Sequence, residues 1–299
     1  MRLIRSPATL VADGKLWSSL FQQRAAEYKA LCIQAYNIAR LRVDELSPLA
    51  TTKPKAIVTD IDETFLDNSP YAVHRASQDQ DYTIDTWIQW TAKGDADTLA
   101  GALSFFNYAA SINFEIFYVT NREEKEKEGT LQNLEKFNFP FADNAHLILR
   151  QNTSSKELRR QQIARTHEIV LLLGDNLADF SSLFDKKSGK EREQHVQQLA
   201  AEFGKKFIVL PNANYGGWEE AIYNNSYNWT AAQKDSIIKR AINESLFSYL
   251  CPDILFFIAG KLKYLLLKTI FGYCHLPTIN RHLIHGSSLQ FFSRLAVIS

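Results

Sequence analysis

The sequence lacks most of the features that place a protein in a specialised class at first sight. Its 299 residues include only three cysteines, Cys32, Cys251 and Cys274, and their spacing matches neither a metal site nor a disulfide framework. The 34 basic and 33 acidic side chains nearly cancel, and a net charge of +1 exerts no long-range pull on nucleic acid or anionic membranes. We also find no internal repeat and no low-complexity segment. These absences leave a globular chain, long enough for one full α/β core and a smaller subdomain.

Long hydrophobic runs are missing at both ends of the chain. Residues 1–7 carry basic side chains but no apolar stretch of the length that a secretory signal peptide needs. Near the other end, Asp253 and three lysines interrupt the apolar residues, so no run approaches the roughly 20 residues of a transmembrane helix. The final third of this region has neither helical nor strand periodicity. We therefore expect residues 244–299 to be an appendage that takes no part in catalysis.

What the sequence does contain is a short apolar run that ends in two aspartates. Residues 56–59 are typical of a buried parallel strand, and Asp60 and Asp62 follow at once. Residues two apart point the same way in extended geometry, so both carboxylates can face one site. At about 4 Å and an effective dielectric near 20, two such charges repel by about 4 kcal/mol. A bound cation relieves this repulsion, and oxygen ligands favour magnesium.

A second apolar run ends in the same way. Residues 169–173 lead into Gly174 and Asp175, and Asp179 follows four residues later. An Asp-x-Asp pair alone is a weak signal, because it also occurs in solvated turns after strands. Two hydrophobic strands that both end in acidic pairs are harder to explain by chance. We interpret them as adjacent strands that share one metal at the carboxyl edge of a parallel sheet.

Strand and helix patterns alternate along the chain, which predicts a parallel sheet with right-handed crossovers. A helical pattern covers residues 15–46, and Pro48 and Pro54 follow it. Further strands are predicted at 114–119, 146–149 and 207–210, and helices at 101–111, 123–137, 156–164 and 191–203. A polar, aromatic segment at about 70–100 interrupts this rhythm, as an inserted cap over the site would. The expected domains are an N-terminal helical segment (1–54), a core with this cap insertion (55–243) and the appendage.

The ends of four predicted elements supply the side chains that phosphoryl transfer through an aspartyl-phosphate requires. These are a carboxylate nucleophile, a hydroxyl with backbone amides, a lysine and a metal-binding acid pair. They are contributed by Asp60 and Asp62, by Thr120, Asn121 and Arg122, by Lys156, and by Asp175 and Asp179.

With these residues in place, the sequence resembles the haloacid dehalogenase (HAD) superfamily, and more closely its class C acid phosphatases, which include bacterial outer-membrane lipoproteins. Three blocks carry the resemblance: residues 60–71 (DIDETFLDNSPY), 174–180 (GDNLADF) and 211–219 (PNANYGGWE). It departs from the usual family pattern at Thr59 and Phe65, neither of which is a reacting group. The resemblance implies an α/β fold, a HAD-like parallel sheet flanked by helices, with a small helical cap subdomain.

The resemblance also implies roles for the candidate residues. Asp60 would be the nucleophile that forms a phosphoaspartate, and Asp62 would act as general acid and then general base. Thr120 and the Asn121 amide would bind the phosphoryl oxygens, while Lys156 neutralises developing charge.

A Mg²⁺ ion is part of what the resemblance implies. The carboxylates of Asp60 and Asp175 and the backbone carbonyl of Asp62 would hold it. Asp179 would support the metal through water or hold Lys156 in place.

Two aromatic side chains would complete the site by clamping a nucleobase or an aryl leaving group. They are Trp90, in the predicted cap, and Tyr215, in the loop after the last strand. The alternative is that both belong to the core, as most aromatic residues do. For Arg122 a substrate contact and a structural ion pair are left open.

The predicted function is a magnesium-dependent acid phosphatase, of 5′-nucleotidase type, that hydrolyses nucleoside monophosphates and aryl phosphates at mildly acid pH. One alternative is a non-catalytic storage or binding relative, against which the presence of Asp60 argues. Another is a different phosphotransferase of the superfamily, against which Asp62 argues. The predicted partner is a small phosphomonoester and not a nucleic acid polymer; a homo-oligomer is left open. The family implies a periplasmic or outer-membrane lipoprotein, although this chain shows no signal peptide, so membrane association would need a lipid anchor that is missing here.

Overall fold

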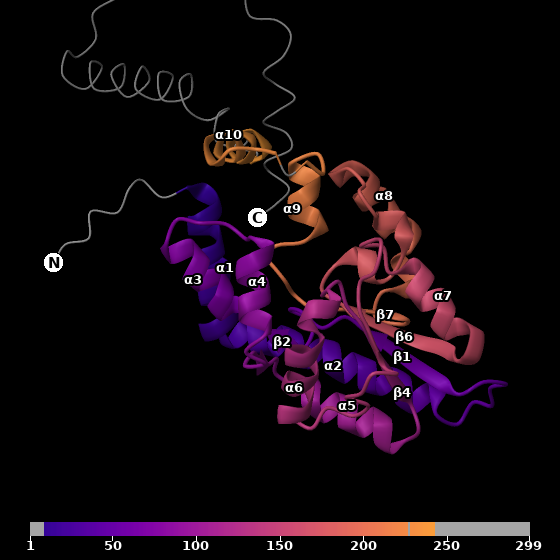
Figure 1. The fold of residues 1–299 in the computed structure, drawn as a ribbon. Helices are drawn as coiled ribbons and strands as arrows, with labels where there is room; N and C mark the ends of the chain where they lie inside the picture. Colours follow the sequence, from indigo (N-terminus) through magenta and orange to yellow (C-terminus); the bar gives the residue numbers. More distant parts are fainter. Residues whose placement is uncertain (1–8, 227, 243–299) are drawn as a thin grey trace, which may run out of the picture. The chain divides into compact units, whose positions relative to one another are not determined.

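A five-stranded parallel sheet lies at the centre of the protein (Figure 1). The computed structural model describes residues 9–226 and 228–242. The strands run in the order β5 (Leu147–Ile148), β4 (Glu115–Val119), β1 (Lys55–Thr59), β6 (Glu168–Gly174) and β7 (Phe207–Val209). Every neighbouring pair is parallel, and helices flank the sheet, which confirms the predicted α/β fold.

Each face of the sheet has its own hydrophobic core, because successive residues of a strand point to opposite sides. Ile57 of β1 belongs to the larger core, which includes buried side chains of α2 (Ala26–Leu46) and α5 (Ala102–Ser111). Val58 belongs to the other core, beneath α7 (Glu157–Thr166). Since both faces of β1 are covered, its sequence is apolar almost throughout and ends where the polar site begins.

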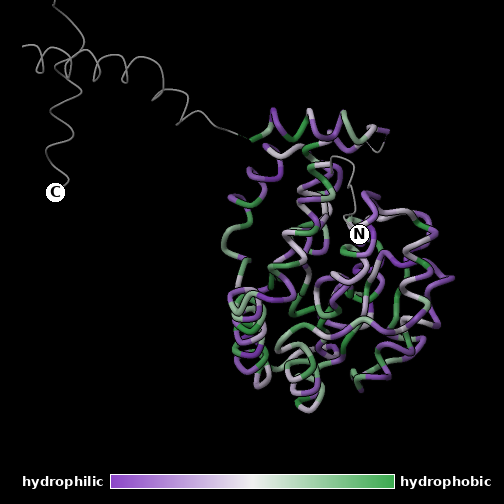
Figure 2. The backbone as a smooth tube through the Cα atoms, turned by 90° about the vertical axis from the view of Figure 1, so that its left-hand side faces the viewer, coloured by the Kyte–Doolittle hydropathy of each residue, from purple (hydrophilic) through white to green (hydrophobic). Residues whose placement is uncertain are grey.

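The remaining elements include further helices, along which hydrophobic and hydrophilic residues are mixed (Figure 2). They are α1 (Leu10–Arg24), β2 (Leu66–Asp67), α3 (Ser69–Ser77), α4 (Ile84–Thr91), β3 (Asp97–Thr98), α6 (Lys127–Lys136), α8 (Gly189–Gln198), α9 (Gly217–Ile222) and α10 (Ala231–Ala241). The segment expected as a cap contains α3 and α4, between the paired strands β2 and β3. That this segment acts as a cap stays a prediction.

The prediction of one helix over residues 15–46 was wrong. The structure has two helices, α1 and α2, separated by Ala25, whose backbone is extended (φ −77°, ψ 128°). Neither glycine nor proline marks this break. The two helices instead contact different parts of the fold: α1 contacts α3, whereas α2 contacts the sheet and α5. Tertiary packing therefore overrides a continuous helical propensity here.

Helix α1 connects two loops that lie far apart in the sequence. Gln22, which is 4% exposed, donates from Nε2 to Oδ1 of Asp67 at 2.7 Å. Oε1 of Gln22 accepts from Nδ2 of Asn214 at 2.9 Å. The hydroxyl of Ser19 donates to Oδ1 of Asn214 at 3.1 Å. Strand β2 and the loop after β7 are therefore both hydrogen-bonded to α1.

Three further features of the sequence can be compared with the structure: the absence of a membrane helix, the cysteines and the predicted appendage. No helix among residues 9–226 and 228–242 is long and apolar enough to cross a membrane. Cys32 is fully buried in the larger core, where it packs as a small apolar residue. The predicted appendage, residues 244–299, lies outside the described residues.

Candidate active site

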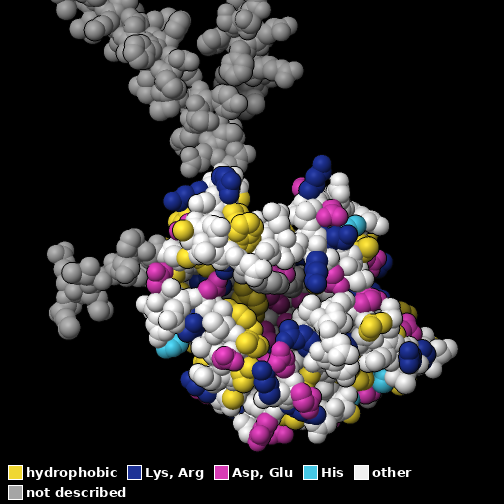
Figure 3. Space-filling view, turned by 45° about the horizontal axis from the view of Figure 1, so that its top comes forward, with side chains coloured by type: hydrophobic (Ala, Val, Ile, Leu, Met, Phe, Trp, Pro, Cys, Tyr) yellow, Lys and Arg dark blue, Asp and Glu magenta, His cyan; other side chains and the backbone are white. Residues whose placement is uncertain are grey.

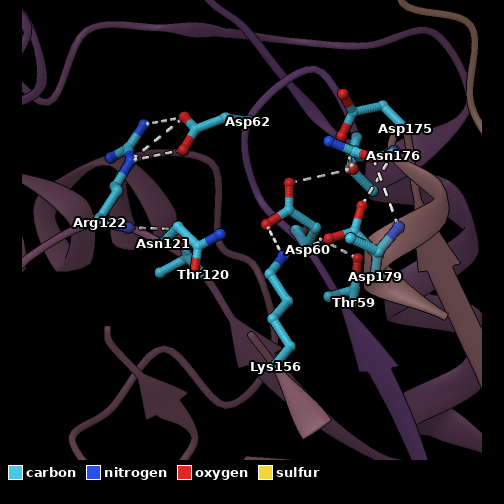
Figure 4. Close-up of polar contacts among 12 residues, drawn as sticks. Thr59, Asp60, Asp62, Thr120, Asn121, Arg122, Lys156, Asp175, Asn176 and Asp179 are labelled. Atoms are coloured by element: carbon cyan, nitrogen blue, oxygen red, sulfur yellow. Dashed lines mark hydrogen bonds and ion pairs between the residues drawn. The ribbon is translucent and has the colours of Figure 1, made fainter. Parts of the chain in front are cut away.

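The carboxyl ends of β1 and β6 meet at the middle of the sheet, and an aspartate follows each of them. The backbone N–H of Asp60 donates to the carbonyl of Leu173 at 3.0 Å, which sets the two strand ends side by side. The hydroxyl of Thr64 lies 3.1 Å from Oδ1 of Asp175 and 3.4 Å from Oδ2 of Asp60. Oxygens of Asp60, Asp175 and Asp179 all lie within 4.8 Å of one another (Figure 4). The structure thus brings together three of the predicted metal ligands.

One buried lysine lies against this acidic cluster of Asp60, Asp175 and Asp179. The ammonium of Lys156 pairs with Asp60 and, at 2.7 Å, with Oδ1 of Asp179. Burial raises the pKa of Asp60, although Lys156 acts in the opposite direction. Burial also raises the pKa of Asp175, and the charges of Asp179 and Asp60 add to the effect. Three carboxylates and one ammonium leave a formal charge of −2, so the cluster fits a hard divalent cation.

The side chain of Asp62 turns away from the cluster and pairs with Arg122 (Figure 4). Nη2 of Arg122 donates to Oδ1 of Asp62 at 2.7 Å, and Nε lies 3.2 Å from each carboxylate oxygen. Arg122 is 2% exposed, and its Nη1 donates to the hydroxyl of Thr130 at 3.0 Å. The structure therefore shows Arg122 in an ion pair. That the backbone carbonyl of Asp62 binds a metal stays a prediction.

Thr120 and Asn121 follow β4, the strand next to β1. Thr120 is fully buried, and its hydroxyl accepts from the backbone N–H of Arg122 at 3.1 Å, which closes the turn after the strand. Asn121 is exposed, and its side-chain oxygen accepts from Nη2 of Arg159 at 2.8 Å. Arg159, which is buried, thus holds the predicted phosphate-binding turn in place.

Both predicted clamp residues are held by hydrogen bonds at their polar ends. The indole N–H of Trp90 donates to Oδ1 of Asn68 at 2.7 Å. The hydroxyl of Tyr215 donates to Oε2 of Glu63. Both residues are half-buried. The space-filling view shows a hollow with acidic side chains in it and hydrophobic ones beside it (Figure 3).

Comparison with known proteins places this site in a family. The model of the HAD superfamily, subfamily IIIB (Acid phosphatase), matches residues 7–218, which include every predicted site residue. The chain belongs to this family. Two solved structures of the class C acid phosphatase from Bacillus anthracis resemble it, each with a TM-score of 0.76. The one with tungstate bound is 38% identical and covers 79% of this chain and 98% of its own; the other is 39% identical and covers 78% and 98%.

Two curated plant proteins share part of the sequence. Acid phosphatase 1 from Solanum lycopersicum is 30% identical over 133 residues, which are 41% of this chain and 50% of that protein. Stem 31 kDa glycoprotein from Glycine max is 29% identical over 125 residues, 40% of this chain and 49% of that protein. The chain therefore spans about half the length of the curated relatives it matches.

Four further side chains lie in this site, and the sequence alone did not predict a role for them. Thr64 contacts both Asp60 and Asp175, and Nδ2 of Asn212 donates to Oδ2 of Asp175 at 2.7 Å. The other two, Glu63 and Asn68, hold the clamp aromatics. Each of the four lies inside a block that carries the family resemblance. That location was the available signal, because an asparagine or a threonine also occurs in ordinary turns.

Glu63 is an unusual member of this group. It is 1% exposed and has a backbone φ of +55°, the left-handed region that non-glycine residues seldom adopt. Burial raises the pKa of its carboxyl group to about 8, and the charge of Asp62 adds to this shift. A residue held in such a conformation, with its charge disfavoured, indicates that the turn is shaped by the site around it.

Gly174 is the position in this site where a side chain would be least tolerated. A Cβ there would lie 2.4 Å from Oδ2 and 2.5 Å from Cβ of Asp179. We expect Gly174→Ala to push Asp179 away from Lys156, to lower kcat, and to reduce the free energy of unfolding by about 1–3 kcal/mol. Urea denaturation and steady-state hydrolysis would measure both effects. Gly189→Ala is the control, since a Cβ at Gly189 meets nothing within 4 Å. Equal stability of the two variants would contradict the close approach.

Proposed function

We propose that this chain is an acid phosphatase that hydrolyses phosphomonoesters through a phosphoaspartate on Asp60. The observation that carries the proposal is the place of the Asp60 carboxylate. It is 9% exposed at a strand end, paired with Lys156, and belongs to an acidic cluster suited to a divalent cation. A carboxylate nucleophile needs such surroundings to approach an anionic phosphate. The relative with tungstate bound supports the proposal, because tungstate is a tetrahedral oxyanion like phosphate.

The reaction takes place in two halves. In the first, an oxygen of Asp60 attacks phosphorus, the bond from phosphorus to the ester oxygen breaks, and Asp62 gives its proton to that oxygen. In the second, a water attacks the phosphoaspartate, Asp62 takes a proton from it, and phosphate leaves with Asp60 restored. Arg122 holds Asp62 in place through its ion pair at 2.7 Å.

The phosphoryl group is bound by groups around the nucleophile. Lys156 compensates the charge that develops on the phosphoryl oxygens, and the turn at Thr120 and Asn121 supplies donors to them. Asp179 orients Lys156 through its 2.7 Å ion pair.

The cofactor we propose is Mg²⁺. The carboxylates of Asp60 and Asp175 and the backbone carbonyl of Asp62 would hold it, and the formal charge of −2 around Lys156 supports a divalent ion. When bound, the ion would reduce the repulsion between the nucleophile and the phosphoryl oxygens.

A panel of substrates tests the proposed function. A nucleoside 5′-monophosphate, an aryl phosphate and a sugar phosphate should all be hydrolysed in the presence of Mg²⁺, and much more slowly after chelation. A non-catalytic relative would release no phosphate from any of them. A phosphotransferase would release the alcohol only when a second acceptor is supplied.

The aromatic pair is expected to decide which leaving groups bind well. Trp90→Ala and Tyr215→Ala should raise KM for nucleoside monophosphates about tenfold, because stacking contributes about 1–3 kcal/mol per base. Small alkyl phosphates, which have no ring to stack, should show a much smaller change in KM. Steady-state kinetics on both substrate types measures the difference. An equal rise in KM for both substrate types would mean that the two rings are structural.

A further inference from the structure

Asn68 occupies the N-terminal cap of α3, but its side chain does not cap the helix. An asparagine at this position usually accepts a backbone N–H from the first turn. Among the described residues, the Asn68 side chain accepts no such bond, and Oδ1 of Asp67 accepts the N–H of Ser69 at 2.8 Å instead. Asn68 is 2% exposed, so its amide is buried and directed elsewhere. Its partners lie in the site.

The two ends of this amide contact two different parts of the site. Oδ1 accepts the indole N–H of Trp90 at 2.7 Å, and Nδ2 donates to Oδ1 of Asp62 at 2.9 Å. An indole N–H can only donate, so it fixes the carbonyl end of the amide toward Trp90. The amino end must then face Asp62. Trp90, on α4, thus sets the orientation of the group that contacts the proposed acid.

The backbone of Asn68 extends the network to the second aromatic residue. Its N–H donates to Oε1 of Glu63 at 2.8 Å, and the other oxygen of Glu63 accepts from the hydroxyl of Tyr215. Asn68 is therefore the residue that Asp62, Trp90 and, through Glu63, Tyr215 have in common.

The contacts on the Asp62 carboxylate are uneven. Oδ1 accepts from Nη2 of Arg122 at 2.7 Å and from Asn68 at 2.9 Å. Within the described part of the chain, Oδ2 has only the Nε of Arg122, at 3.2 Å, which it shares with Oδ1. With Oδ1 fixed from two sides, the carboxylate cannot rotate freely, and Oδ2 is the oxygen left to face a leaving group.

We propose that Asn68 is a positioning residue for the acid–base step, and that the indole N–H of Trp90 acts through it on Asp62. The inference rests on the proposed phosphatase function. If Trp90 acted by stacking alone, it would matter only for leaving groups that touch its ring. In this inference, Trp90 also contributes to proton transfer when the leaving group is too small to touch the ring.

The test compares leaving groups. 4-Nitrophenyl phosphate has a leaving group that needs little protonation, whereas glycerol phosphate needs a general acid. We expect Asn68→Leu, and Trp90→Phe, which keeps a ring but loses the N–H, to lower kcat/KM for glycerol phosphate about tenfold more than for 4-nitrophenyl phosphate. A smaller folded fraction would lower both values equally, so the ratio reports positioning and not stability. Trp87→Phe is the control, because Trp87 lies on the same helix but packs on Tyr71 and Tyr82.

The outcomes separate this inference from the proposed function. If Asn68→Leu does not fold, Trp90→Phe still decides, because it removes the N–H contact while keeping an aromatic ring, and Trp87→Phe controls for the smaller ring. An unchanged ratio in Trp90→Phe would overturn the inference, provided that Asp62→Asn changes the ratio strongly. If the unaltered protein hydrolyses neither substrate, the proposed function itself fails. A changed ratio in Trp87→Phe as large as in Trp90→Phe would also overturn the inference, since the effect would then be general to α4.

Discussion

Replacing Asp60 with asparagine is expected to abolish phosphate release while the protein stays folded. An amide oxygen is a poor nucleophile and cannot form the acyl phosphate, so kcat should fall by at least about a thousandfold. Without a divalent cation, Asp60 lies in a cluster of like charges and the substitution removes one of them, so the melting temperature measured in EDTA should not fall. Steady-state hydrolysis of an aryl phosphate, with circular dichroism as the folding check, measures both quantities.

The matched control for this variant is Asp95→Asn. Asp95 pairs with Lys136 at the surface, with 69% of its side chain exposed, and should lose no activity. Asp62→Asn should be slow in a different way, since phosphoenzyme can still form from a substrate with a good leaving group and then persist. More than a few per cent of residual activity in Asp60→Asn would show that the phosphoaspartate mechanism is wrong.

Removal of divalent cations is expected to cost both activity and thermal stability. Without a cation, the carboxylates of Asp60 and Asp175 repel each other; burial raises the pKa of Asp175, and the charges of Asp179 and Asp60 add to that effect. A ligand at one hundred times its Kd stabilises the native state by about 2.7 kcal/mol. For a domain of this size that corresponds to about 5–10 °C in Tm. Thermal unfolding with EDTA, and then with added Mg²⁺, measures the shift.

Asp175→Ala locates the ion. This variant should lose activity, and its melting temperature should no longer respond to Mg²⁺. Asp95→Ala, at the exposed ion pair with Lys136, serves as control and should keep the full response. A Mg²⁺ response in Asp175→Ala equal to that of the unaltered protein would place the metal elsewhere.

Two of the candidate site residues were predictable from the sequence because each follows directly from a local pattern. An apolar run gives a buried strand, the end of a parallel strand faces the crevice, and an acid at that position lies in the site. Asp60 and Asp175 meet this description, and the structure sets them side by side. The family resemblance supplied roles for the rest of the candidate set, including Lys156, which opens a predicted helix outside the three matching blocks.

Contacts between residues far apart in the sequence could not be predicted in this way. The pairing of Asp62 with Arg122 joins residues 60 apart, and that of Asn68 with Trp90 joins residues 22 apart. No local periodicity encodes such a distance. The break at Ala25 has the same origin, because the sequence favours helix on both sides and only the packing of α1 and α2 on different elements ends it.

The hydrogen bonds of α1 limit how this catalytic unit could be divided. A fragment beginning at Ala26 would keep α2 in the core and contain every residue assigned to the reaction, and from its length it would pass as a self-sufficient enzyme. Yet Gln22 joins Asp67, the neighbour of Asn68, to Asn214, the neighbour of Tyr215. Without α1 this bridge is lost, and the contact of Tyr215 with Glu63 is left to hold the two sides of the proposed leaving-group site together. Such a fragment would keep its chemical groups and discriminate less sharply between leaving groups.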